Sequence, residues 1–202
     1  MDNIFIIDDL VSKSYANMIE ERVTENKFPW YFNKHLVTDQ IFTDGTDKEI
    51  NHVGHNHFLY EDRKVVSPFF EFIHPLILAI GDTKLFDYDV LERARFNLTQ
   101  ANTTSSRDYH LPHIDSEYPH WVAIYYVNDS DGDTHIFEQR TEDFDHDTDI
   151  KTMINADFTI KKRVTPKKGR VLIFDGHQYH TSSFCKTTPY RIVLNINYGK
   201  LF

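Results

Sequence analysis

Two potential metal ligands, His113 and Asp115, are separated by a single residue in the sequence HID. In an extended chain, side chains alternate between two faces, so these two side chains would point the same way. Two more histidines, His177 and His180, follow in FDGHQYHTSS. Two histidines and one carboxylate form the facial ligand set that suits non-haem Fe(II) and leaves positions open for a chelating co-substrate and dioxygen. The pattern predicts such an iron site, with His180 or His177 as the distal ligand.

Arg191 stands just inside the apolar run PYRIVLNIN, which follows these histidines. A guanidinium offers a planar fork of donors that matches a carboxylate, which the compact ammonium of lysine does not. An HxD triplet alone is weak evidence, because it occurs by chance in many chains. Here it lies between a polar loop and a strand pattern, and a histidine and then an arginine follow it. This order favours an iron oxygenase.

The chain of 202 residues is long enough for one domain with its own core. Its net charge of −9 argues against a general nucleic-acid or anionic-membrane partner, because such binding depends on clustered Lys and Arg. The basic run at 161–170 is interpreted as a solvated turn leading into a strand, with contact to an acidic partner as the alternative. Cys185 is the only cysteine, which excludes an internal disulfide. MDNIFIIDDL has no basic start and no long apolar run, so we expect no signal peptide or membrane anchor and a cytoplasmic location.

The first 90 residues are expected to contain two helices. Apolar residues recur at helical intervals over 12–26. A second, apolar helix is expected over 67–80, with Ser67 as its N-cap and Pro75 as a kink or restart. The aromatic cluster FPWYF at 28–32 is interpreted as packing the first helix on a sheet, with an aromatic wall of a substrate cleft as the alternative.

Three histidines lie close together in NHVGHNHFLYEDR, at His52, His55 and His57. The flanking sequence offers no cysteine or carboxylate in a recognisable ligand framework. We therefore interpret them as polar surface residues rather than as a second metal site, and their role stays open.

From residue 90 onward, short alternating strand patterns are separated by polar turns. The turn at 128–134 is expected to join two strands as a hairpin, and the acidic linker at 140–158 is a loop that could gate or recognise a substrate. We predict an α+β, mostly β fold: a double-stranded β-helix, or jelly roll, with N-terminal supporting helices. We expect one domain over 1–202, with 1–90 as helical support and N-terminal strands and 91–202 as the catalytic jelly-roll core. The expected strands cover residues 3–7, 91–100, 121–127, 135–139, 170–174 and 190–198.

The C-terminal half closely resembles the 2-oxoglutarate and Fe(II)-dependent dioxygenases, specifically their prolyl-4-hydroxylase-like branch. The resemblance runs from about Leu91 to Tyr198, through HID, WVAIYYVNDSDGDTHIF, PKKGRVLIFDGHQYHTSS and YRIVLNINY in this order. Similar short chains are frequent in tailed-phage genomes, and the N-terminal half with its FPWYF resembles theirs too. A phage-encoded chain would work in the cytoplasm of the host.

The resemblance implies that His113, Asp115 and His180 bind iron. His180 is favoured over His177 because the family's ligand ends the aromatic-flanked triplet, before small residues. Arg191 would pair with the C5 carboxylate of 2-oxoglutarate, and Tyr126 matches a position whose hydroxyl often donates to that carboxylate.

Other polar residues are candidates for the surroundings of this site. Asn195 and Asn197 share a strand face with Arg191, so they either line the co-substrate pocket or form hydrogen bonds within the sheet. Tyr109, His110 and His120 flank the HID triplet and could orient the ligands. Asp175, before the distal histidines, could take part in gating or substrate recognition.

The implied reaction consumes dioxygen, decarboxylates 2-oxoglutarate to succinate and CO2, and hydroxylates an aliphatic carbon, with a prolyl residue as the family-level substrate. Asp115 occupies the position where halogenating relatives bind halide, so hydroxylation is expected rather than halogenation. One alternative is a demethylase of alkylated bases, but those enzymes carry a second arginine where Asn197 stands. Others are a non-catalytic, cupin-like metal- or ligand-binding module and a phage virion scaffold, which would not need Arg191 or Tyr126. The motifs determine neither the substrate, which could be a peptide, amino acid, metabolite or base, nor the oligomeric state.

Overall fold

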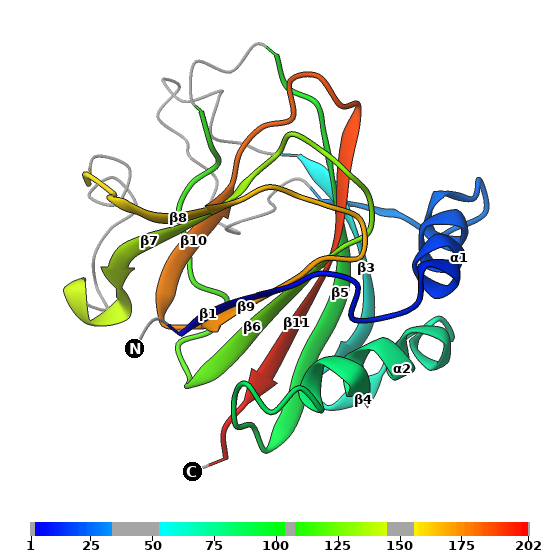
Figure 1. The fold of residues 1–202 in the computed structure, drawn as a ribbon, viewed down its shortest axis with the longest axis horizontal. Helices are drawn as coiled ribbons and strands as arrows, with labels where there is room; N and C mark the ends of the chain where they lie inside the picture. The colour runs from blue at the N-terminus through cyan, green and yellow to red at the C-terminus, as the bar shows by residue number, and fades with distance from the viewer. Residues whose placement is uncertain (1–2, 34–52, 104–107, 145–155, 202) are drawn as a thin grey trace.

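The computed structural model describes residues 3–33, 53–103, 108–144 and 156–201, which form two antiparallel β-sheets and two α-helices (Figure 1). The larger sheet has the strand order β1-β9-β6-β11-β5-β3-β2, with β4 paired to β3, and the smaller sheet has the order β10-β7-β8. The elements are β1 (Ile4–Ile7), α1 (Lys13–Thr24), β2 (Tyr31–Asn33), β3 (Gly54–Glu61), β4 (Lys64–Val65), α2 (Phe70–Gly81), β5 (Val90–Gln100), β6 (His120–Tyr126), β7 (Thr134–Arg140), η1 (Thr141–Asp143), β8 (Ile160–Val164), β9 (Val171–Asp175), β10 (Gln178–Ser182) and β11 (Tyr190–Gly199).

The larger sheet separates two buried layers. On β11, Ile192, Leu194 and Ile196 face the layer that contains α1 and α2, whereas Val193 faces the smaller sheet. The layer between the sheets combines Val193 and residues of β6 and β9 with Ile136 of β7 and Val164 of β8. Because strand side chains alternate, the polar residues that share a face with Val193 must also point between the sheets. This interior therefore has a polar part, which contains the candidate site.

Both helices lie on the outer face of the larger sheet (Figure 1). Ser12 caps α1 by accepting a hydrogen bond from the Tyr15 amide, 3.2 Å away. The predicted Ser67 cap of α2 is wrong, because this helix begins at Phe70 and the Ser67 hydroxyl instead accepts from the Phe69 amide within the preceding turn. Pro75 lies inside α2, which continues to Gly81. Neither described helix is long and apolar enough to cross a membrane.

The predicted hairpin between residues 121–127 and 135–139 is also wrong. β6 pairs with β9 and β11 in the larger sheet, whereas β7 pairs with β8 and β10 in the smaller one. The turn at 128–133 therefore carries the chain from one sheet to the other. Its polar composition is that of a tight turn, and only the long-range pairing distinguishes the two arrangements.

The aromatic cluster at 28–32 divides into two parts. Phe28 is buried and its ring contacts those of Trp30, Phe96 and His57, so this half packs in the core. The interpretation of His57 as a polar surface residue is wrong, because it is buried here on β3, with its two ring nitrogens 2.8 Å from the Pro29 carbonyl oxygen and 2.7 Å from the Ser67 hydroxyl. Tyr31 and Phe32 are exposed on β2. His52 and most of the acidic linker lie outside the described residues.

A candidate metal and co-substrate site

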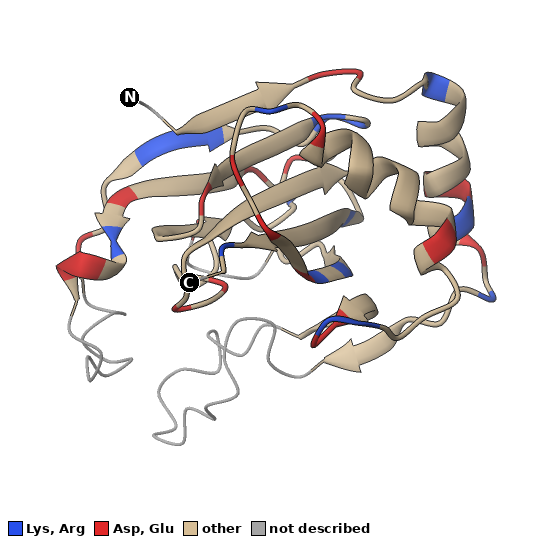
Figure 2. Ribbon diagram, turned by 90° about the horizontal axis from the view of Figure 1, so that it is seen from below, with Lys and Arg blue, Asp and Glu red and all other residues tan. Residues whose placement is uncertain are grey.

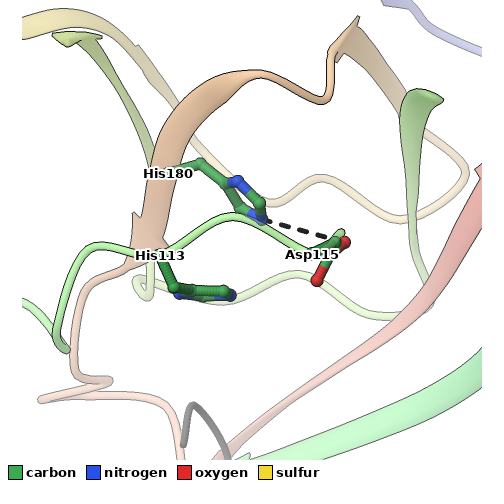
Figure 3. A group of neighbouring side chains, drawn as sticks. All are labelled: His113, Asp115 and His180. Atoms are coloured by element: carbon green, nitrogen blue, oxygen red, sulfur yellow. Dashed lines mark ion pairs between the residues drawn. The ribbon is translucent and has the colours of Figure 1, made fainter. Parts of the chain in front are cut away.

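The side chains of His113, Asp115 and His180 converge between the two sheets (Figure 3). Their potential ligand atoms all lie within 4.8 Å of one another, and they are the only such group among the described residues. His113 and His180 exchange two backbone hydrogen bonds, of 3.0 Å and 2.9 Å, in an isolated antiparallel bridge. The main chain thus holds the two histidines side by side, although the HID segment is a single bridge and not a continuous strand.

Both imidazoles are arranged to present Nε2 to a metal. The Nδ1 atom of His113 lies 3.2 Å from the Leu111 carbonyl oxygen, and Nδ1 of His180 lies 3.3 Å from that of Gln178. With Nδ1–H donating to these carbonyls, the Nε2 lone pair is left free on each ring. Burial lowers the pKa of His113, and it lowers the pKa of His180 to about 3. Both rings are therefore neutral at physiological pH, as metal ligation requires.

Asp115 is buried but remains a carboxylate. Its Oδ2 accepts hydrogen bonds from the side-chain amides of Asn195 and Asn197, at 3.0 Å and 3.1 Å, and its Oδ1 lies 3.0 Å from Nη2 of Arg93. Burial alone would raise the pKa of this group, but the charge of Arg93 holds it well below its usual value. The set of two neutral imidazoles and one carboxylate fits a divalent iron ion in both charge and donor type.

An open cavity adjoins the triad, and Arg191 lies in its wall. Nη2 of Arg191 donates to the Thr134 hydroxyl at 2.9 Å, and its buried Nε has no hydrogen-bond partner among the described residues. The Tyr126 hydroxyl donates to the same Thr134 oxygen at 2.7 Å, and Tyr126 is completely buried and does not line the cavity. Thr134 thus stands between Tyr126 and the cavity.

This arrangement makes Thr134 a donor toward the cavity. A hydroxyl oxygen has two lone pairs and one hydrogen, and here Arg191 and Tyr126 use both lone pairs. The remaining hydrogen and the unpartnered Nε of Arg191 can be donated to a carboxylate at this end of the cavity. No pattern in the sequence distinguished Thr134, because a single threonine after a polar turn is common.

The cross-strand register shows which residues lie at each end of the cavity. Arg191 of β11 is opposite Thr99 of β5, and Asn195 is opposite Arg95. Four residues of strand span about 13 Å. Since Asn195 contacts Asp115, the metal-ligand group and Arg191 occupy opposite ends of one cavity.

The other predicted residues are placed as follows. His177 is not part of the triad, because its Nδ1 lies 3.2 Å from a carboxylate oxygen of Asp175, which also pairs with Arg140. His110 lines the cavity. Nδ1 of His120 lies 2.7 Å from the Tyr118 carbonyl oxygen, and the Tyr109 ring packs on His135 and Phe137.

Asn195 and Asn197 both bind Asp115, and only Asn195 lines the cavity. The sequence reading missed Arg93 and Arg95 as well as Thr134. The alternation RxRxNxT in β5, at residues 93–99, indicates a strand with one polar face, which could have pointed to these arginines. A strand with that face in solvent would show the same pattern, so the sequence alone does not identify them as site residues.

No protein-family model and no curated protein sequence matches this chain. Solved structures do match over nearly its whole length. An oxidoreductase of the 2OG-Fe(II) oxygenase family from Burkholderia pseudomallei is 13% identical, with 98% of this chain and 85% of that chain covered and a TM-score of 0.65. A Pseudomonas putida prolyl-4-hydroxylase is 12% identical, with 99% and 94% covered and a TM-score of 0.58. The epimerase SnoN, in complex with Fe3+, alpha ketoglutarate and nogalamycin RO, is 12% identical, with 98% and 79% covered and a TM-score of 0.64.

Identities this low show a shared fold. The chain therefore has the double-stranded β-helix fold of the 2-oxoglutarate and Fe(II) oxygenases, and the fold predicted from the sequence is confirmed. The matched structures include both a hydroxylase and an epimerase, so the fold alone does not determine the reaction.

Proposed function

We propose that this protein is an Fe(II)- and 2-oxoglutarate-dependent dioxygenase that hydroxylates an aliphatic carbon. One observation carries the proposal: a single cavity has two neutral histidines at one end, with the Asp115 carboxylate just behind them, and a buried arginine with an unpartnered donor at the other end. A structural metal site would need the first group but not the second. A scaffold that binds anions would need the second but not the first.

In this proposal, His113, Asp115 and His180 hold Fe(II), which when bound supplies the activation of dioxygen coupled to the decarboxylation of 2-oxoglutarate to succinate and CO2. Arg191 and Thr134 bind the distal carboxylate of 2-oxoglutarate and fix its orientation, while the other end of the molecule reaches the metal. This positioning, rather than covalent chemistry, is the contribution of the protein.

Three further residues maintain Asp115 as a ligand. Asn195, Asn197 and Arg93 fix the position of its carboxylate and keep it ionised. A carboxylate at this position leaves no place for a halide ion on the metal, which supports hydroxylation as the outcome. The matched prolyl hydroxylases make a prolyl residue the first family-level substrate to test.

The alternative of a base demethylase finds less support in this site. Asn197, at the position of that group's second arginine, donates to Asp115 and accepts from Nε of Arg93 at 3.0 Å. It is thus occupied with the metal ligand and not with a bound co-substrate.

The proposal is tested by anaerobic titration of the metal-free protein with Fe(II) and 2-oxoglutarate, followed by the visible charge-transfer absorption of the chelate. We expect a band in the wild type, no band in His180→Ala, and about 100-fold weaker 2-oxoglutarate binding in Arg191→Ala, since charge-assisted hydrogen bonds are lost. Arg22→Leu, which changes an exposed arginine on α1, is the matched control. Tight binding of Fe(II) without a band would favour the non-catalytic metal-binding module.

A further inference from the structure

Arg95 is a second arginine in the wall of the cavity, and the proposed function does not use it. The described residues that line the cavity include Arg95 and Arg191 but no carboxylate. Arg191 has its role in binding the distal carboxylate of 2-oxoglutarate. The charge of Asp115, just behind the lining, is matched by Arg93 at 3.0 Å. The positive charge of Arg95 is thus left without a counterion in the site.

The surroundings of Arg95 leave part of its guanidinium unbound. It is partly buried, with its guanidinium carbon 5.6 Å from the centre of the Phe58 ring, and its buried Nε has no hydrogen-bond partner in the described part of the chain. No described carboxylate lies within ion-pair distance, and Asp115 and Glu61 act on it only at longer range. Burial, with the nearby charge of Arg93, lowers the pKa of Arg95 to about 10, so the group is still charged at neutral pH.

An acceptor without a partner lies beside this donor. Asn195 is the cross-strand neighbour of Arg95, and its buried Oδ1 makes no hydrogen bond to any described residue. Its amide orientation is fixed, because its Nδ2 must donate to the Asp115 carboxylate and its oxygen must therefore point elsewhere. Arg95 and Asn195 are thus paired across two strands, and both line the cavity at its metal end, about 13 Å of strand from Arg191.

We propose that Arg95 and Asn195 form the recognition site for a carboxylate-bearing substrate that also has an N–H group next to the carboxylate. Free α-amino acids and the C-terminal residues of peptides share this chemistry, in which the carboxylate meets Arg95 and the N–H group donates to Oδ1 of Asn195. A prolyl residue inside a peptide carries neither a free carboxylate nor an N–H group, so it presents neither of these two groups. The inference rests on the proposed dioxygenase function and specifies its substrate class.

The test uses the protein loaded with Mn(II) and 2-oxoglutarate under anaerobic conditions, where no turnover occurs. The probes are the free amino acids and a set of dipeptides, each as the carboxylate and as the primary amide. Line broadening of probe protons by Mn(II) reports binding near the metal and gives a dissociation constant. We expect at least one carboxylate to bind about tenfold or more tightly than its amide. Tighter binding of free amino acids or of dipeptides then shows whether the substrate is a free amino acid or the C-terminal residue of a peptide.

Substitutions then assign the preference to Arg95. Arg95→Leu should remove the difference between acid and amide, Arg95→Lys should retain part of it, and Arg22→Leu should leave it unchanged. The proposal is overturned if no carboxylate binds, if amides bind equally well, or if Arg95→Leu keeps the preference. It is also overturned if Arg95→Leu weakens 2-oxoglutarate instead, which would assign Arg95 to the co-substrate.

The Fe(II) chelate band separates this inference from the proposed function. A wild-type band with no preference for carboxylates would refute only the role of Arg95. Absence of the band in the wild type would refute the dioxygenase itself.

Discussion

The hydroxyl of Thr134 has a more direct role in the proposed co-substrate site than the tyrosine that the family resemblance indicated. It accepts hydrogen bonds from both Arg191 and Tyr126, and it alone of the two hydroxyls faces the cavity. We predict that Thr134→Val weakens 2-oxoglutarate binding about tenfold or more, because the carboxylate loses a donor and Arg191 loses an acceptor. Tyr126→Phe should have a smaller effect, since the ring keeps its packing against Arg191 and Tyr126 does not line the cavity.

Titration of the Fe(II)-loaded variants Thr134→Val and Tyr126→Phe with 2-oxoglutarate measures the two dissociation constants under the same conditions. A substitution at Thr24, an exposed residue at the end of α1, provides a threonine control. If Tyr126→Phe weakened the co-substrate more than Thr134→Val did, the direct contact inferred from the resemblance would be correct instead.

Residue types and order were enough to single out His113, Asp115 and His180, which the structure brings together, and Arg191, which lies in the wall of the adjoining cavity, because metal ligation and carboxylate binding each restrict the choice of side chain. The roles of Thr134, Arg95 and Asn195 could not be predicted in this way. Each role depends on which of the residue's donors and acceptors are already used in hydrogen bonds to its neighbours. Those neighbours lie on strands that are far apart in the sequence. Asn195 was a candidate for either the pocket or the sheet, and the structure places it between Asp115 and the cavity.

Among the structural elements, the turn at 128–133 positions the Arg191 end of the site. The Asn128 side chain accepts from the Ile192 amide at 2.8 Å, which anchors the turn to the start of β11. Gly132 is needed for close approach, because a Cβ there would lie 3.0 Å from Cδ of Arg191 and 2.9 Å from Sγ of Cys185. The sequence showed a polar turn, but its partners lie about 60 residues further on, beyond the reach of local patterns.

Asp131 joins this turn to the segment before β11. Its carboxylate accepts hydrogen bonds from the amides of Lys186, Thr187 and Thr188 and from both threonine hydroxyls. Although partial burial alone would raise the pKa of Asp131, these donors lower it far below its ordinary value of 3.8. The folded state therefore favours the ionised form, and the resulting stability is present above about pH 4 and lost as the pH falls below it.

We predict that Asp131→Asn lowers the free energy of unfolding by about 2 kcal/mol at pH 7, since hydrogen bonds to a charged acceptor are lost. The difference from wild type should shrink as the pH falls from 4 toward 2, because the wild type then loses the same contribution. Urea denaturation across this range measures it, with Asp133→Asn in the same turn as the control. A difference that stayed constant with pH would show that ionisation of Asp131 does not stabilise the fold.

The basic run at 161–170 covers strand β8 as well as the turn expected there. Lys161, Lys162 and Arg163 follow one another on β8, the last strand in the described order of the smaller sheet (Figure 2, blue). Charged side chains on a terminal strand disfavour pairing with the strand of another chain. This gives the run a structural role that requires no acidic partner.

At the scale of the whole molecule, the proposed ligands should stabilise the fold by mass action. A ligand at 100 times its dissociation constant adds about 2.7 kcal/mol, which for a domain of this size corresponds to roughly 5–10 °C in melting temperature. We predict such a rise with Mn(II), and a further rise with 2-oxoglutarate only when the metal is present. Thermal denaturation with and without a chelator tests this.

The variant His180→Ala should lose most of the shift caused by the metal, and Arg191→Ala only the part added by 2-oxoglutarate. An equal shift by 2-oxoglutarate in the presence of a chelator would mean that it binds without the metal. That result would contradict the proposed chelate.

The overall architecture was predictable because alternating apolar residues define strands and a mostly β chain of this length has few ways to bury them. The pairing of those strands was not. β1 joins the edge of the larger sheet beside β9, and β3 pairs with β5, although both come from the first 90 residues, which were expected as helical support and N-terminal strands. Such partners are chosen by long-range packing, which leaves no local signal.

The bridge between His113 and His180 has a mechanical consequence. These residues are far apart in the chain, and an ion bound to both would close the intervening segment, which contains β6 to β9, into a loop. The two ligands come together only in the folded chain, so opening this loop would require release of the ion. A bound ion would then act as a reversible cross-link, and the strands inside the loop could not be pulled out one by one until the ion was released.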